Sequence, residues 1–379
     1  MAVISYAYSM KSLEDASLAS KIVLVRIDAD VPLKTTYPIE VADDYRLRKL
    51  LPTLFYLINH RAKIILCGHL GRPMGKVDPS LTMKPIFLHL SALLNKKIIF
   101  ASNPFSATTS KAIKELSEGD ILGLENLRFF KGEEDNSRTF ARKLANLAEI
   151  YVNDSFGTSH REDSSIVAVT EFLPSYAGLQ LERELEMLTN LTRHPARPFI
   201  ALIGGAKIAD KLPVIENLLP RVDRVIVGGR VANTFLASQG VDVKNSVIEP
   251  EYISQASKLL KNSRGKIILP VDYCWDREQI LDVGVRSTNQ TIEYLKYAQT
   301  ILWSGVFGRV EQAGFDKSSR LIARAIASSA ATSVVGGGDT VGYVDKLGLT
   351  EKYSFVSTGG SAMLELLGGR ALPGIRTLG

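Results

Sequence analysis

Short apolar, β-branched runs alternate with segments of helical periodicity along nearly the whole chain, and this alternation constrains the fold most. It is typical of parallel sheets, because two parallel strands need a crossover connection that is usually a helix. The runs fall into two groups on either side of about residue 175. We expect strands at residues 22–27, 63–67, 97–100, 120–124 and 149–152, and then at 199–203, 224–227, 266–271, 300–303, 332–335 and 354–356. The sequence therefore predicts an α/β protein with two doubly wound parallel sheets.

Basic side chains gather in loops of the first half, most of them directly after an expected strand. In the loop after residues 63–67, glycines let the backbone come close to a ligand, and the guanidinium of Arg72 offers a planar fork of donors that suits phosphate or carboxylate. Because the ends of parallel strands share one edge of a sheet, these basic residues are expected to meet around a small anionic ligand. They are Arg46, His69, Arg72, Arg128 and Arg161. One such loop alone is equally compatible with an ordinary strand-to-helix turn.

Adjacent glycines occur only beyond residue 200. Three of these clusters follow β-branched strands, and a strand, glycines and a helix start form the geometry in which backbone N–H groups and the helix dipole hold phosphates. Lys207 and Lys211 follow the first cluster and lie on one face of the expected helix. Asp339 offers a carboxylate of the kind that Mg²⁺ takes beside nucleotide phosphates, and it is also a candidate helix cap. The clusters are Gly204-Gly205, Gly228-Gly229, Gly336-Gly337-Gly338, Gly359-Gly360 and Gly368-Gly369.

Taken in order, these segments resemble the phosphoglycerate kinase family over nearly the whole chain. The resemblance rests on several motifs that occur in the family's order and at roughly its spacing, so chance is a poor explanation. The matching segments are Val25–Pro32, His69–Pro73, Glu125–Phe129, Asn153–Gly157, Gly204–Lys211, Gly336–Thr340 and Ser357–Gly360.

The resemblance implies two Rossmann-like domains joined by a hinge helix. An acid-substrate domain would cover residues 1–174, with residues from about 366 to 379 returning to it, and a nucleotide domain would cover residues 175–365. The implied reaction is phosphoryl transfer between the acyl phosphate of 1,3-bisphosphoglycerate and ADP, giving 3-phosphoglycerate and ATP, with Mg²⁺ on the nucleotide. Arg46 is the implied catalytic residue, because a guanidinium can stabilise the charge that spreads over the transferring phosphoryl group.

The resemblance also assigns residues to the two substrates. Those implied for the acid substrate are Asp28, Asp30, Arg46, His69, Leu70, Gly71, Arg72, Arg128 and Arg161. Those implied for the nucleotide are Gly205, Lys207, Lys211, Gly228, Gly229, Glu311, Gly337, Gly338, Asp339, Thr340, Gly359 and Gly360. Among these, Lys207 and Lys211 would join Arg46 in catalysis, and Asp339 would hold the metal.

The chain departs from the family pattern at several positions. Asp30 stands where the family has asparagine, and it places a like charge beside an anionic ligand. The run Trp303–Gly308 lacks the family's Asn-Gly-Pro, and Gly360-Ser361 replaces two glycines of a triplet. The segment Asp272–Asp282 is short, with Ile280 at the place of a glycine. The acid site is therefore well matched, whereas the base pocket is altered and is expected to discriminate weakly between nucleotides.

Composition limits the remaining possibilities. The net charge is +6, but lysine and arginine are dispersed, so nucleic acid is not an expected partner. The two cysteines lie far apart in sequence, and no apolar run reaches membrane length. We expect a cytoplasmic monomer that acts on small molecules. Two alternatives remain: a kinase of a related carboxylate, which Asp30 suggests, and a catalytically silent binding protein on the same scaffold.

Overall fold

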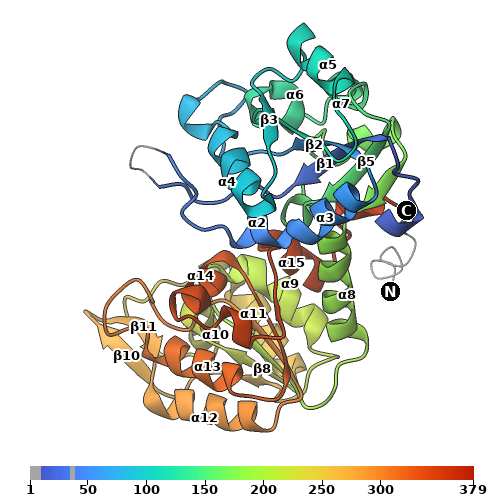
Figure 1. The fold of residues 1–379 in the computed structure, drawn as a ribbon. Coiled ribbons are helices and arrows are strands. Elements are labelled where there is room, and N and C mark those ends of the chain that lie inside the picture. The colour runs from blue at the N-terminus through green and yellow to red at the C-terminus, as the bar shows by residue number, and fades with distance from the viewer. Residues whose placement is uncertain (1–9, 35–38) are drawn as a thin grey trace. The chain divides into compact units, whose positions relative to one another are not determined.

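The computed structural model describes residues 10–34 and 39–379 of the chain (Figure 1). The chain forms two compact units. The first comprises Met1–Glu186 together with Ala371–Gly379, and the second comprises Met187–Arg370. Within the described part of the chain, no helix is long and apolar enough to cross a membrane.

The first unit is built on a parallel sheet with strand order β3-β4-β2-β1-β5-β6. Its strands are β1 (Ile22–Ile27), β2 (Lys63–Cys67), β3 (Ile98–Ala101), β4 (Ile121–Leu124), β5 (Ile150–Asp154) and β6 (Ser175–Ala177). Its helices are α2 (Tyr45–Lys49), α3 (Leu51–Asn59), α4 (Lys84–Leu94), α5 (Ala107–Lys114), α6 (Lys131–Glu134), α7 (Arg138–Ala145) and α16 (Pro373–Arg376). The side chains of β1 are buried almost throughout, as a central parallel strand with both faces covered requires.

The second unit repeats this plan with strand order β14-β13-β12-β7-β8-β9. Its sheet consists of β7 (Phe199–Ile203), β8 (Arg224–Val227), β9 (Ile267–Ile268), β12 (Thr300–Ser304), β13 (Thr332–Gly336) and β14 (Phe355–Val356). The helices are α9 (Ile208–Leu218), α10 (Gly229–Ser238), α11 (Ile253–Asn262), α12 (Val285–Lys296), α13 (Lys317–Ala327), α14 (Gly338–Lys346) and α15 (Ser361–Leu367). An antiparallel hairpin of β10 (Tyr273–Asp276) and β11 (Gln279–Val283) lies outside the sheet.

The two doubly wound parallel sheets confirm the predicted fold class. Their register brings the ends of β1, β2 and β5 level, because Arg26 pairs with Cys67 on one side and with Asn153 on the other. The loops that leave these strands therefore start from the same edge of the first sheet. In the second unit, Ser304 at the end of β12 pairs with Ile203 and Gly336 in the same way.

The division between the units lies later than the sequence analysis placed it. The expected boundary at residue 174 precedes β6, which pairs with β5 through Tyr151 and Ser175 and so keeps the chain in the first sheet. The division falls instead within α8 (Leu179–Arg193), whose Leu181, Leu185, Leu188 and Leu191 are all buried. The C-terminal return begins at Ala371 rather than near residue 366, since Leu367 still accepts a hydrogen bond from Asn217 in the second unit.

Candidate active site

Arg46 lies against the end of β1 in the first unit. Its Nη1 is 3.4 Å from Oδ1 of Asp28 and donates to the backbone oxygen of Asp30 at 3.0 Å. Asp28 is buried, and its Oδ2 has no hydrogen-bond partner among the described residues. Burial raises the pKa of Asp28, against the opposing field of Arg46. The end of β1 therefore presents one buried carboxyl and one anchored guanidinium.

The loop after β2 is tied to this position through its backbone. The N–H of Gly71 donates to Oδ1 of Asp30 at 3.0 Å, and the oxygen of Gly71 accepts from Nη1 of Arg128 at 2.9 Å. Gly71 has a φ of +62°, and a Cβ at this residue would lie 2.8 Å from Cδ2 of Leu81. Glycine is favoured here because a side chain would be strained and would have to displace the end of Leu81.

Leu70 and Asn126 fix the same loop from the side of β4. The side chain of Leu70 is buried, and its N–H and C=O both bond to the carboxamide of Asn126, at 3.3 Å and 2.8 Å. Leu70 therefore supports the loop and does not present its side chain to a ligand. Sequence reasoning did not assign Asn126, although it belongs to the motif that supplies Arg128.

Arg72 and Arg161 act electrostatically on the buried His69. Burial and the fields of Arg26, Arg161, Arg46 and Arg72 hold the pKa of His69 well below its usual value. Arg128 is almost fully buried, with Nε 3.5 Å from Glu134 and Nη2 3.6 Å from Asp163. All five basic residues that the sequence placed around an anion lie in the first unit: Arg46 on α2 and the others in segments that follow β2, β4 and β5.

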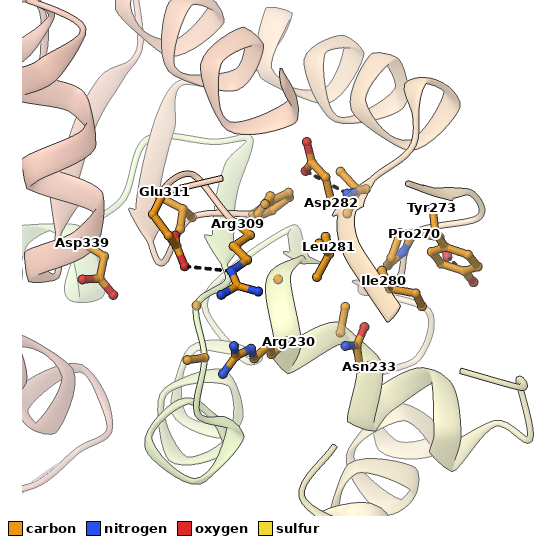
Figure 2. A pocket seen from close by; sticks show the side chains of 18 residues that line it. Arg230, Asn233, Pro270, Tyr273, Ile280, Leu281, Asp282, Arg309, Glu311 and Asp339 are labelled. Atoms are coloured by element: carbon orange, nitrogen blue, oxygen red, sulfur yellow. Dashed lines mark hydrogen bonds and ion pairs between the residues drawn. The ribbon is translucent and has the colours of Figure 1, made fainter. Parts of the chain in front are cut away.

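A cavity of about 190 Å³ lies in the second unit (Figure 2). Of the residues expected to bind nucleotide, those that line it are Gly205, Gly229, Glu311 and Asp339. Figure 2 shows Asp339 and Glu311 toward one end and Pro270, Tyr273 and Ile280 toward the other. The first end is therefore polar. The second is mainly apolar and is lined in part by the β10-β11 hairpin.

Glycine brings two loops of this cavity into backbone contact. Gly229 has a φ of +61°, and a Cβ there would lie 2.8 Å from the nitrogen of Gly205. At Gly228, a Cβ would lie 2.3 Å from Cγ of Phe307. Neither glycine can carry a side chain without moving its neighbour, so the loops after β7 and β8 hold each other in place.

Lys211 is buried behind these loops. Its Nζ donates to Oγ of Ser304 at 2.9 Å. Burial lowers its pKa to about 8, while the carboxylates of Asp210 and Asp339 act in the opposite direction. Lys207 is exposed at the N-cap of α9.

The other residues expected to bind nucleotide do not line this cavity. The buried Oγ1 of Thr340 accepts from the N–H of Gly305 at 2.8 Å. Thr340 therefore stabilises the loop that follows β12. Gly337 caps α14 with a φ of +97°, and Gly338 is the first residue of that helix. The N–H of Gly359 donates to Ser357, and Gly360 caps α15.

The lining residues that sequence reasoning missed include Arg230, Asn233 and Arg309. Arg309 pairs through Nε with Glu311 at 3.3 Å, and Figure 2 shows Arg230 close by. Asn233 is buried on α10, where its Nδ2 donates to the oxygen of Val247 at 3.3 Å. Its Oδ1 lacks a partner within the described ranges. Arg230 directly follows the Gly228-Gly229 cluster, which could have indicated it, whereas no local pattern marks Asn233 or Arg309.

Known proteins are similar to this chain in both sequence and fold. A model of the phosphoglycerate kinase family matches residues 13–370. The phosphoglycerate kinases of Desulforudis audaxviator and Pelotomaculum thermopropionicum are 44% and 42% identical to this chain, over 97% of it and 98% of their own length. The solved structure of phosphoglycerate kinase from Coxiella burnetii has a TM-score of 0.85 at 34% identity, covering 97% of this chain and 98% of that one. The chain therefore belongs to the phosphoglycerate kinase family and is a phosphotransferase that moves a phosphoryl group between 1,3-bisphosphoglycerate and ADP, giving 3-phosphoglycerate and ATP.

Proposed function

We propose that the first unit binds 3-phosphoglycerate and that the second binds the nucleotide. The observation that carries this assignment is the basic cluster around Asp28 and Asp30, which belongs entirely to the first unit. Guanidinium groups and an imidazole suit the phosphate and carboxylate of the acid. The glycine-lined cavity with Lys211 behind it belongs entirely to the second unit and suits a nucleoside phosphate.

In this assignment, Arg46 stabilises the transferring phosphoryl group. Asp28 and the oxygen of Asp30 hold one edge of its guanidinium, and about a third of the side chain stays accessible. Phosphoryl transfer spreads negative charge over the equatorial oxygens, so a positioned cation supplies the main chemical requirement. A general base is not required, because the attacking carboxylate is ionised at neutral pH.

Asp339 is the residue we propose for Mg²⁺. Its carboxylate lies in the first turn of α14, lines the cavity and acts electrostatically on Lys211. An accessible carboxylate beside a phosphate site fits Mg²⁺, which keeps several waters and takes its other ligands from the nucleotide. When bound, the metal would neutralise phosphate charge, while Lys207 and Lys211 would hold the phosphate oxygens.

We further propose that α8 is the hinge of a monomeric, cytoplasmic enzyme. The helix continues from the first unit into the second. Transfer needs the reacting atoms at roughly 3 Å, so substrates held on separate units must be brought together. The free thiols of Cys67 and Cys274 suit a reducing compartment.

Calorimetric titration of paired variants tests the assignment. Arg72→Ala is expected to weaken binding of 3-phosphoglycerate at least about tenfold and to leave MgADP binding unchanged, because one charge-assisted contact is lost. Lys207→Ala is expected to do the reverse. If either variant weakened both ligands equally while remaining folded, the division of the substrates between the units would be wrong.

A further inference from the structure

Arg26 lies directly beneath the acid site, and the mechanism above does not use it. It is fully buried on β1. Its Nη2 is 2.7 Å from Nδ1 of His69, and its Nε donates to Oγ of Ser165 at 2.8 Å. Its Nη1 donates to the backbone oxygen of Ile27. Each nitrogen of this guanidinium therefore has a defined neighbour.

The contact with Nδ1 decides where the imidazole of His69 carries its proton. A guanidinium stays protonated in proteins and can only donate hydrogen bonds. Nδ1 must therefore accept, and the ring proton must be on Nε2. A doubly protonated ring would place an N–H of His69 against an N–H of Arg26, so the contact also disfavours the imidazolium.

The donor end of His69 faces the acid site. Nε2 is buried and has no hydrogen-bond partner within residues 10–34 and 39–379. It lies 3.8 Å from Oδ2 of Asp30, too far for a hydrogen bond. A buried N–H without a partner is costly, which a ligand acceptor at this place would relieve.

We propose that Arg26 is a positioning residue that fixes His69 as a neutral Nε2–H donor to the anionic acid substrate. The proposal rests on the binding of 3-phosphoglycerate by the first unit. Arg26 is itself held by a buried chain of hydrogen bonds. Ser165 accepts from Arg26 and donates through Oγ to Oε1 of Glu133 at 2.5 Å, while its N–H donates to Oε2 at 3.0 Å.

A neutral donor gives the site a specific advantage. The charged groups that face or act on His69 are Arg26, Arg46, Arg72, Arg161 and Asp30. Among so many cations, another positive charge would be unfavourable, whereas a neutral N–H still bonds an anion. Because the ring takes up no proton, its hydrogen bond to substrate is expected to persist unchanged between about pH 6 and 8, on either side of the ordinary histidine pKa.

Nitrogen-15 NMR of the imidazole side chains tests this assignment. The chain has five histidines, and a His69→Gln variant identifies the signals of His69. In the unaltered protein we expect Nδ1 without a proton and Nε2 with one, from pH 6 to 8. A protonated Nδ1 would overturn the proposal outright. This result needs no substrate, so it stands apart from any failure of 3-phosphoglycerate to bind.

Two variants of Arg26 then test its effect on substrate. Arg26→Met removes the donor and is expected to release the ring into mixed or protonated forms. The KM for 3-phosphoglycerate should rise at least about tenfold, with the KM for ATP unchanged, as expected for one lost hydrogen bond to a charged group. Arg26→Lys keeps a cationic donor and is expected to restore the Nε2–H signature and most of the affinity.

Other outcomes contradict the proposal. An unchanged tautomer in Arg26→Met would show that Arg26 only supports packing. A changed tautomer with an unchanged KM for 3-phosphoglycerate would show that the substrate does not use this hydrogen. If Arg26→Met does not fold, Arg26→Lys and the spectrum of the unaltered protein still decide the question.

Discussion

Arg46 and Arg48 share one short helix but have different surroundings. Arg46 faces Asp28 and the oxygen of Asp30, whereas Arg48 pairs with Asp44 through Nε at 2.8 Å and is 59% exposed. Arg46→Ala is expected to lower kcat at least about 100-fold with a smaller change in KM, because its interaction forms mainly in the transition state. Arg48→Ala is the matched control and should keep nearly full activity. Steady-state kinetics would contradict the assignment if KM rose for Arg46→Ala while kcat stayed the same.

Asp30 combines a structural role with an unusual charge. Its Oδ1 accepts from the N–H of Gly71 at 3.0 Å, and asparagine could accept the same bond through its own Oδ1. Asp30→Asn removes a like charge beside the anionic substrate, so kcat/KM for 3-phosphoglycerate is expected to stay the same or increase. A large decrease would show that the carboxylate has a positive role, for example in reading a different acid.

Lys211 is expected to make nucleotide binding sensitive to pH. Burial lowers its pKa to about 8, so the ammonium is charged below that pH and becomes neutral above it. The affinity for MgADP should therefore decrease as pH rises through 8, by up to about tenfold per unit where the charge is essential. Titration at several pH values measures this slope. Lys211→Arg, which stays charged, should abolish it, and an equal slope in both proteins would assign the effect to another group.

At the scale of elements, the glycines at the two ends of α10 differ in what surrounds them. Gly229 and Gly240, at opposite ends of α10, both have positive φ values, +61° and +79°. A Cβ on Gly229 would meet the backbone of Gly205, whereas nothing lies within 4 Å of one on Gly240. Gly229→Ala and Gly240→Ala therefore share a backbone strain of about 1–2 kcal/mol, but only the first displaces the loops after β7 and β8.

The pair of variants separates strain from displacement. Gly229→Ala is expected to weaken MgADP binding at least about tenfold, and Gly240→Ala is expected to lower stability with unchanged binding. Thermal unfolding and calorimetry measure the two effects. Equal MgADP affinity in both variants would mean that the contact between the loops is not needed for the nucleotide.

The sequence predicted the strands that carry the site better than the elements at the edges. The strand β1 is apolar apart from Arg26 and was placed at its observed bounds. The expected strand over 266–271 shortens to Ile267–Ile268, since Pro270 cannot donate to a ladder. The hairpin of β10 and β11 was not predicted, because its polar and aromatic residues show no clear alternation. Likewise, Ser175–Ala177 is too short to signal a strand and forms one by pairing with β5.

The candidate site residues also divide into those that a local sequence pattern indicates and those that it does not. Arg72 and His69 were predicted as site residues because glycines and basic groups stand together in the sequence. Arg26 and Asn233 were not, because each is a polar residue within an apolar element, and only the folded chain shows what it contacts. Asn126 lies inside a recognised motif, but its role of holding Leu70 is a tertiary contact. Local patterns therefore predict candidate ligand-binding loops, and only the folded structure shows which buried residues support these loops.

At the scale of the whole molecule, both units and both substrates are expected to be required for one reaction. The basic cluster belongs to the first unit, and the glycine-lined cavity belongs to the second. The most direct measurement is a coupled steady-state assay of ADP formation from ATP with Mg²⁺ and 3-phosphoglycerate. We expect turnover that saturates in each substrate, disappears when 3-phosphoglycerate is omitted and falls at least about 100-fold in Arg46→Ala. A folded protein that gives no turnover above blank at millimolar substrates would contradict the account.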